Sequence, residues 1–154
     1  MKEQLLFFVD PNVNADLREI VKKAAQSAEV IHGVESVYAD TEPDKYPSSR
    51  FTVAGKYLGD KEFGEQRDAD MMLKEIERLL GEEGRHVVFI TYSDITVKSR
   101  GEYLCYCYEA TDFTNIIISV RRLRNLPVIE QKIFLSDLIM HEIRTLLSDQ
   151  YIRK

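Results

Sequence analysis

The sequence predicts an α/β (α+β) fold, with a mixed, mostly parallel twisted sheet, an antiparallel edge strand and packed helices. Strand-like and helix-like segments alternate in the first half, and this order favours parallel strands joined by right-handed crossovers. Two later apolar strands are separated only by Thr111–Thr114, a link short enough for a hairpin. A length of 154 residues with 44% apolar residues fits one domain with a substantial core.

The first elements follow from local patterns. Gln4–Val9 is a continuous apolar run bounded by Asp10-Pro11, which is typical of a buried strand. Asn14 is a suitable N-cap for a helix, because its short side chain can accept a hydrogen bond from the first turn. Glu29–Ile31 and Ser36–Ala39 are expected as short strands, or as one strand broken near Gly33. The apolar positions of the helix recur at helical spacing: Leu17, Ile20, Val21, Ala24 and Ala28.

The middle of the chain contains one irregular and one regular segment. Residues 40–64 hold two prolines and three glycines, and the pattern leaves Arg50–Leu58 open as either a strand or a helix start. The role of this segment is not fixed by the sequence. Arg67–Leu80 is a predicted helix with a clear apolar stripe, and Gly81 and Gly84 follow its end.

The second half is expected to hold three strands and a long helix. Leu126-Pro127 precedes the helix, which is expected from Val128 to about Ser148. Because this helix is apolar on most sides, we expect it to be buried. The three strands are His86–Tyr92, Glu102–Ala110 with one exposed face, and Asn115–Val120.

Charge and composition narrow the classes of partner. The formal net charge of −5 argues against binding to nucleic acid or to anionic membranes, both of which need a basic surface. The basic cluster Arg121, Arg122 and Arg124 is more typical of a solvated rim than of a phosphate site. The apolar run Leu5–Val9 is too short for a signal-peptide core, and no segment is long enough to span a membrane. A cytoplasmic location is therefore expected.

The two cysteines, Cys105 and Cys107, lie two positions apart in an expected strand. Their side chains would share one face of the sheet, but two ligands do not make a structural zinc site. This spacing is also unfavourable for a disulfide. Two buried thiols are the expected arrangement.

The candidate chemistry lies in the final helix. His141 is followed by Glu142, which together form the first half of an HExxH zinc motif. In that motif two histidines at i and i+4 bind the metal and the glutamate activates its water. The i+4 position here is Thr145, and one imidazole does not make a catalytic zinc site, which takes three protein ligands. The simpler interpretation is a hydrogen-bonded helix histidine beside a glutamate that pairs with a cation.

The surrounding sequence gives this dipeptide more weight. The segment from Val88 to Ile143 resembles the core of the archaemetzincins, a family of zinc peptidases. The first half of the chain is similar only in its order of strands and helices. The matching pieces are Ile90–Ile95 (ITYSDI), Tyr103–Ala110 (YLCYCYEA), Ile118–Leu123 (ISVRRL) and Leu138–Ile143 (LIMHEI).

The resemblance implies a single metzincin-like domain over residues 1–154 that lacks the family's C-terminal subdomain. It implies His141 as a zinc ligand, Glu142 as general base, and an edge strand that pairs with an extended peptide. The family's second histidine falls on Thr145, or on Arg144 if one residue is deleted, so that position offers no ligand. Its glycine and third histidine fall on Ser148 and Tyr151.

Four hypotheses follow. The chain is a catalytically impaired relative that binds a peptide, an active metal-dependent hydrolase with non-standard ligands, a shortened metzincin, or an unrelated α/β domain. The first implies weak or absent zinc. The third implies an exposed apolar patch and a homo-oligomer through the surface left by the missing part. The residues that could supply further ligands by their chemistry alone are His32, His86, Asp94, Glu109, Asp112 and Tyr151.

Overall fold

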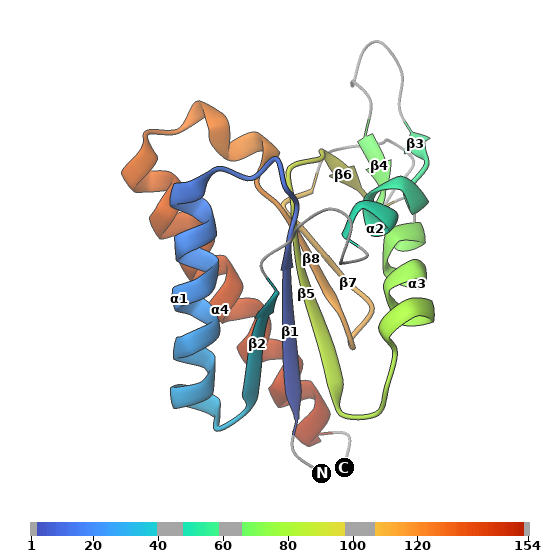
Figure 1. Cartoon of the computed structure of the whole chain (residues 1–154), viewed down its shortest axis with the longest axis vertical. Helices are drawn as coiled ribbons and strands as arrows, with labels where there is room; N and C mark the ends of the chain where they lie inside the picture. Colours follow the sequence, from blue (N-terminus) through green and yellow to red (C-terminus); the bar gives the residue numbers. More distant parts are fainter. Residues whose placement is uncertain (1–2, 40–47, 59–65, 98–106, 153–154) are drawn as a thin grey trace.

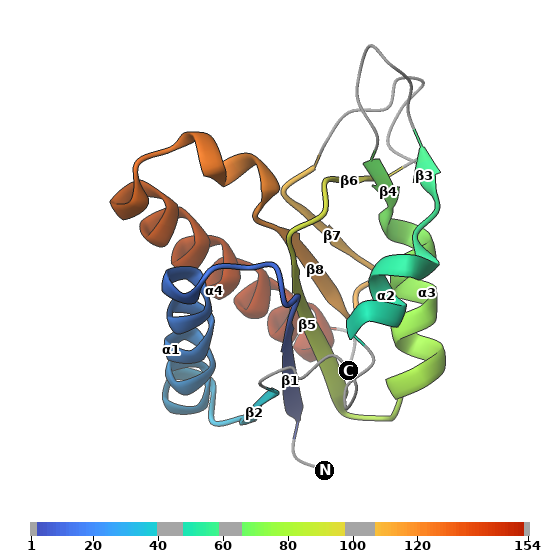
Figure 2. The same cartoon turned by 45° about the horizontal axis from the view of Figure 1, so that its top comes forward.

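The computed structural model describes residues 3–39, 48–58, 66–97 and 107–152. Their main sheet lies between two layers of helices, with α1 and α4 on one face and α2 and α3 on the other (Figures 1 and 2). In chain order the elements are β1 (Gln4–Val9), α1 (Ala15–His32), β2 (Glu35–Ala39), α2 (Ser48–Ala54), β3 (Tyr57–Leu58), β4 (Gln66–Asp68), α3 (Ala69–Leu80), β5 (Arg85–Thr91), β6 (Ile95–Thr96), β7 (Glu109–Thr111), β8 (Ile116–Ser119), the 3₁₀ helix η2 (Arg121–Asn125) and α4 (Val128–Ile152).

The main sheet has the strand order β2-β1-β5-β8-β7. Its first four strands are parallel, and β7 pairs antiparallel with β8 at the edge. The predicted mixed, mostly parallel sheet with an antiparallel edge strand is therefore confirmed. The predicted strand Glu102–Ala110 is confirmed only at its end, since residues 98–106 lie outside the described part.

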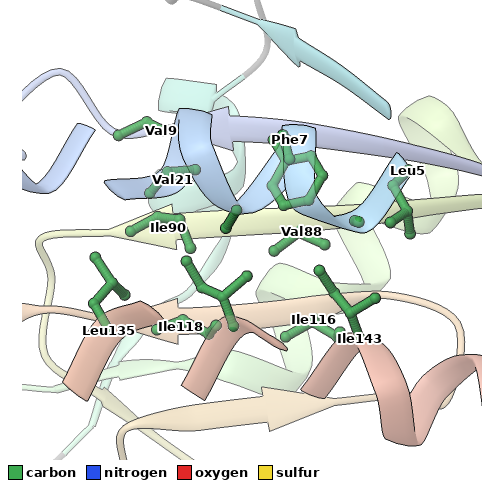
Figure 3. Close-up of a cluster of buried hydrophobic side chains, with 14 of the residues drawn as sticks. Leu5, Phe7, Val9, Val21, Val88, Ile90, Ile116, Ile118, Leu135 and Ile143 are labelled. Atoms are coloured by element: carbon green, nitrogen blue, oxygen red, sulfur yellow. The ribbon is translucent and has the colours of Figure 1, made fainter. Parts of the chain in front are cut away.

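Alternate residues of the central strands supply two separate cores. One core lies between the sheet and the helices α1 and α4, and Figure 3 shows its interdigitated aliphatic side chains. Each fully buried aliphatic side chain of this kind stabilises the fold by roughly 1.5–3 kcal/mol. The strand residues of this first core include Leu5, Phe7, Val9, Val88, Ile90, Ile116 and Ile118.

The second core lies on the opposite face, beneath α2 and α3. Its centre is a set of three aromatic rings, in which Phe51 of α2 makes edge contacts with Phe8 and Phe89 at centroid distances of 5.8 and 5.4 Å. Edge-to-face geometry suits the ring quadrupoles. These contacts hold α2, and the strand β3 that follows it, against the sheet.

Helix α1 begins as predicted but ends later. The Asn14 side chain accepts a hydrogen bond from the Leu17 N–H at 2.9 Å, which confirms the N-cap. The predicted strand Glu29–Ile31 is wrong, because α1 continues to His32. Gly33 ends the helix in the left-handed conformation, with φ of 65°, and its N–H donates to the Glu29 carbonyl. A buried Ala28 keeps the last turn against the core, which outweighs the β propensity of Val30 and Ile31.

The segment Arg50–Leu58, which the sequence left open as strand or helix, contains both a helix and a strand. Residues Arg50–Ala54 belong to α2, and Tyr57–Leu58 form β3. Strand β3 pairs with β4, and β4 with β6, in a small second sheet that the sequence pattern does not predict. The helix predicted from Arg67 begins at Ala69 instead, because Gln66–Asp68 is β4 and the Asp68 carboxylate caps the helix.

Helix α4 is buried on one face, so the prediction that it is buried on most sides is wrong. The side chains that enter the core are Leu135, Ile139, Ile143 and Leu146. The sheet and α1 cover only this face, and Ile129 and Ile133 stay exposed at 70% and 59%. An exposed apolar patch is thus present on α4, while self-association through it stays a prediction. No helix in the described ranges combines the length and apolar character needed to cross a membrane.

Candidate functional site

The His-Glu pair lies on α4, and the helix geometry turns His141 away from the sheet. Ile139 and Ile143 on either side of it are fully buried, whereas His141 is exposed. Two residues along an α-helix correspond to a rotation of about 200°. The imidazole is therefore on the face of α4 opposite the one that packs against the core.

The neighbour of His141 on this face is a cation. Arg144 lies one turn further along, and its Nη2 is 3.3 Å from Nδ1 of His141. A guanidinium can only donate, so Nδ1 accepts and the proton of a neutral ring lies on Nε2. This tautomer leaves no nitrogen lone pair directed at a metal, and the arginine charge opposes a divalent ion nearby.

The other positions of the family motif supply no further ligand among the described side chains. Glu142 is half-buried, while Thr145 and Ser148 are exposed. The side chain of Tyr151 lies outside the described part. Across the described residues, no group of three His, Cys, Asp or Glu side chains is placed to hold a metal ion. The donors present there do not fit the three-ligand catalytic zinc site that the resemblance implies.

His86 has a structural position. It is 1% exposed on β5, with Nδ1 2.9 Å from the Thr114 carbonyl oxygen and Nε2 2.5 Å from Oε2 of Glu3. Both nitrogens are occupied by oxygen atoms from distant parts of the chain. The ring therefore packs inside the fold and joins Glu3 to the β7–β8 turn.

The remaining candidates are dispersed. His32 lies at the end of α1, Glu109 is half-buried in β7, and Asp94 pairs with Arg122 at 2.7 Å. Asp112 caps the β7–β8 turn, where its Oδ1 accepts from the N–H groups of Thr114 and Asn115.

The expectation of two buried thiols is wrong for Cys107. Cys107 is half-buried, and its backbone is bridged to Ile95. Cys105 lies outside the described residues.

A cavity that the sequence did not indicate lies where β5 and β8 end. It has a volume of about 400 Å³ and is open to solvent on one side. We call it the carboxyl-end crevice, and its lining residues are Tyr57, Tyr92, Ser93, Asp94 and Arg121. In parallel α/β sheets, crevices outside the carboxyl ends of the strands are the usual place for ligands.

The turn at the base of this crevice is fixed by hydrogen bonds from two elements. The carbonyl of Ser93 accepts from the Ser119 hydroxyl at 2.7 Å, and the carbonyl of Asp94 accepts from the Arg67 N–H at 2.8 Å. The N–H of Ser93 donates to the Thr91 hydroxyl at 3.1 Å. Residues 92–94 are therefore held in one conformation before any ligand arrives.

Each arginine of the basic cluster has a different environment. Arg122 forms a two-point contact with Asp94, at 2.7 and 3.3 Å. Arg121 stacks over the Tyr92 ring with its guanidinium carbon 4.8 Å from the centroid, and Arg124 is exposed. The sequence has three arginines within four residues at a strand end, but only the positions of Tyr57 and Tyr92 reveal which one faces the cavity.

The described elements define an α/β fold, in which a mostly parallel sheet lies between two layers of helices. The structure is similar to the crystal structure of archaemetzincin from Methanopyrus kandleri, with a TM-score of 0.60 and 18% sequence identity. The aligned part covers 92% of this chain and 71% of that chain. The chain thus has the archaemetzincin fold. No protein-family model matches the sequence, and no curated protein matches it closely.

Proposed function

We propose that this chain is a non-catalytic relative of the zinc metallopeptidases, which binds an extended peptide at the edge of its sheet and does not hydrolyse it. The observation that carries the loss of zinc catalysis is the environment of His141. Its Nδ1 lies 3.3 Å from a guanidinium, and the i+4 position on the same helix is a threonine. In an HExxH zinc peptidase, each of the two helix histidines is neutral and directs a nitrogen lone pair at the metal.

Zinc content tests the first part of this proposal. We expect well under one zinc per chain after incubation with zinc and dialysis, and no decrease in His141→Ala, because one exposed imidazole beside a cation is a weak site. Elemental mass spectrometry gives the metal content. His32→Ala is the matched control, since it removes another accessible imidazole outside α4.

Peptide cleavage completes this test. With zinc added, wild-type protein and Glu142→Ala are expected to leave a peptide library equally untouched, as read by mass spectrometry. About one zinc per chain that disappears in His141→Ala, together with cleavage that depends on Glu142, would mean that the chain is a working hydrolase with non-standard ligands.

The proposed peptide site is supported by the position of β7. Among the described strands, β7 is the last of the main sheet and pairs with β8 on one side. The Ser119 N–H donates to the Tyr108 carbonyl, and the Asp112 N–H donates to the Asn115 carbonyl. Residues 108, 110 and 112 are therefore the hydrogen-bonded positions of the β7–β8 pair. The N–H of Thr111 is therefore directed away from β8. An extended peptide can add to such an edge through backbone hydrogen bonds.

A substitution at Thr111 tests the edge directly. Thr111→Pro removes the outward N–H and is expected to weaken binding of a labelled pool of extended decapeptides severalfold, measured by fluorescence polarisation. Thr111→Val loses the same hydroxyl but keeps the N–H, so it is expected to bind like the wild type. Equal affinities for all three proteins, or no binding by the wild type, would refute the edge site.

A further inference from the structure

The carboxyl-end crevice has a charge distribution opposite to that of the whole chain. The chain carries a formal charge of −5. Within the crevice, the carboxylate of Asp94 is already paired with Arg122, which lies beside the lining residues. Arg121 has no carboxylate partner in the described part of the chain, and its guanidinium lies over the Tyr92 ring. Among the described lining residues, Arg121 therefore carries a positive charge that no described carboxylate compensates.

The stacking of Arg121 prepares it to bind an anion. The guanidinium carbon of Arg121 is 4.8 Å from the Tyr92 ring centroid, and a guanidinium held by a cation–π contact can still donate through its N–H groups. Two parallel N–H donors match the spacing of two oxygens of a phosphate or carboxylate. The contact with Tyr92 also limits the rotamers of the side chain, so less freedom is lost on binding.

Another lining residue is a tyrosine whose orientation is fixed by an arginine. Tyr57 is 57% exposed, and its ring lies against Arg67, whose guanidinium carbon is 4.2 Å from the centroid. Nη2 of Arg67 donates to the Tyr57 hydroxyl oxygen at 2.9 Å, while Nη1 donates to the carbonyls of Thr52 and Gly55. The phenol oxygen thus accepts from Arg67, so the phenol proton is available to a ligand. Since the same arginine binds the end of α2, Tyr57 is held by the fold.

From these lining residues we infer that the carboxyl-end crevice binds a small anionic molecule, in which a phosphate or carboxylate is attached to a planar ring. Arg121 pairs with the anion, Tyr57 and Ser93 offer hydroxyl donors, and the tyrosine rings supply flat apolar surface. The volume of about 400 Å³ lies within the range of small-molecule sites. This site is separate from α4 and does not depend on zinc or on peptide binding.

An NMR titration of the ¹⁵N-labelled chain tests the inference. Phenyl phosphate and benzoate distinguish the two anions, inorganic phosphate tests the need for a ring, and benzyl alcohol tests the need for charge. We expect shifts centred on the amides of Ser93, Asp94 and Arg121 for at least one ring-bearing anion. We expect weaker shifts with inorganic phosphate and none with benzyl alcohol.

Variants on the same 3₁₀ helix decide whether the site is the one inferred. Arg121→Gln is expected to weaken binding about tenfold or more, since a charge-assisted pair is lost. Arg124→Gln removes an exposed arginine of η2 and is expected to bind like the wild type. Arg121→Lys keeps the charge without the paired donors and should lie between them. No shifts with any anion, shifts elsewhere, or equal binding by Arg121→Gln with its spectrum otherwise unchanged would overturn the inference.

Discussion

Ile139→Ala is expected to lower the free energy of unfolding by about 2–5 kcal/mol, because it removes a fully buried side chain and leaves a cavity between α4 and the sheet. Ile139 is 0% exposed and belongs to the core that joins α1, α4 and the central strands. Urea denaturation followed by circular dichroism measures the change, provided that the slope with urea stays the same.

Ile133→Ala is the matched control, since it makes the same chemical change on the same helix at a side chain that is 59% exposed. Its unfolding free energy is expected to stay within about 0.5 kcal/mol of the wild type. Similar losses in both variants would show that α4 is rotated relative to the structure described. The pair therefore also tests the outward direction of His141, which is fixed by the burial of Ile139 and Ile143.

His86→Ala, the second variant with a large expected effect, is expected to lower the free energy of unfolding by about 2–4 kcal/mol. The change leaves the Thr114 carbonyl and the Glu3 carboxylate without their imidazole partner, and it opens a cavity beside β5. Thermal and urea denaturation measure the loss. The expected stability change is structural, so adding zinc should not alter the difference between wild type and variant.

His32→Ala is the control for this prediction. His32 lies in the last turn of α1, where an imidazole interacts with the helix end, and its loss is expected to cost less than about 1 kcal/mol. A metal role for His86 would instead appear as zinc-dependent stabilisation of the wild type that is lost in His86→Ala. Equal stability of His86→Ala and the wild type would contradict the structural role.

Local patterns were sufficient for the central elements. The apolar runs of β1, β5 and β8, the Asn14 cap and the short hairpin link each carry their own signal within a few residues. The order of motifs along the sequence also predicts the similarity to the archaemetzincin fold. Short strands such as β3, β4 and β6 have no such signal, because two or three residues form a strand only when distant partners pair with them.

In the candidate sites, too, some features follow from the local sequence and others only from the tertiary structure. The sequence by itself determined that His141 and Glu142 are adjacent on a helix and that the i+4 position is Thr145, because helix periodicity is local. Only the tertiary structure decided that His141 faces away from the core, since α4 could have packed with another face against the sheet. It also decided that Tyr57, Ser93 and Arg121 line one cavity, because residues from separate strands meet at the carboxyl edge only after the chain has folded.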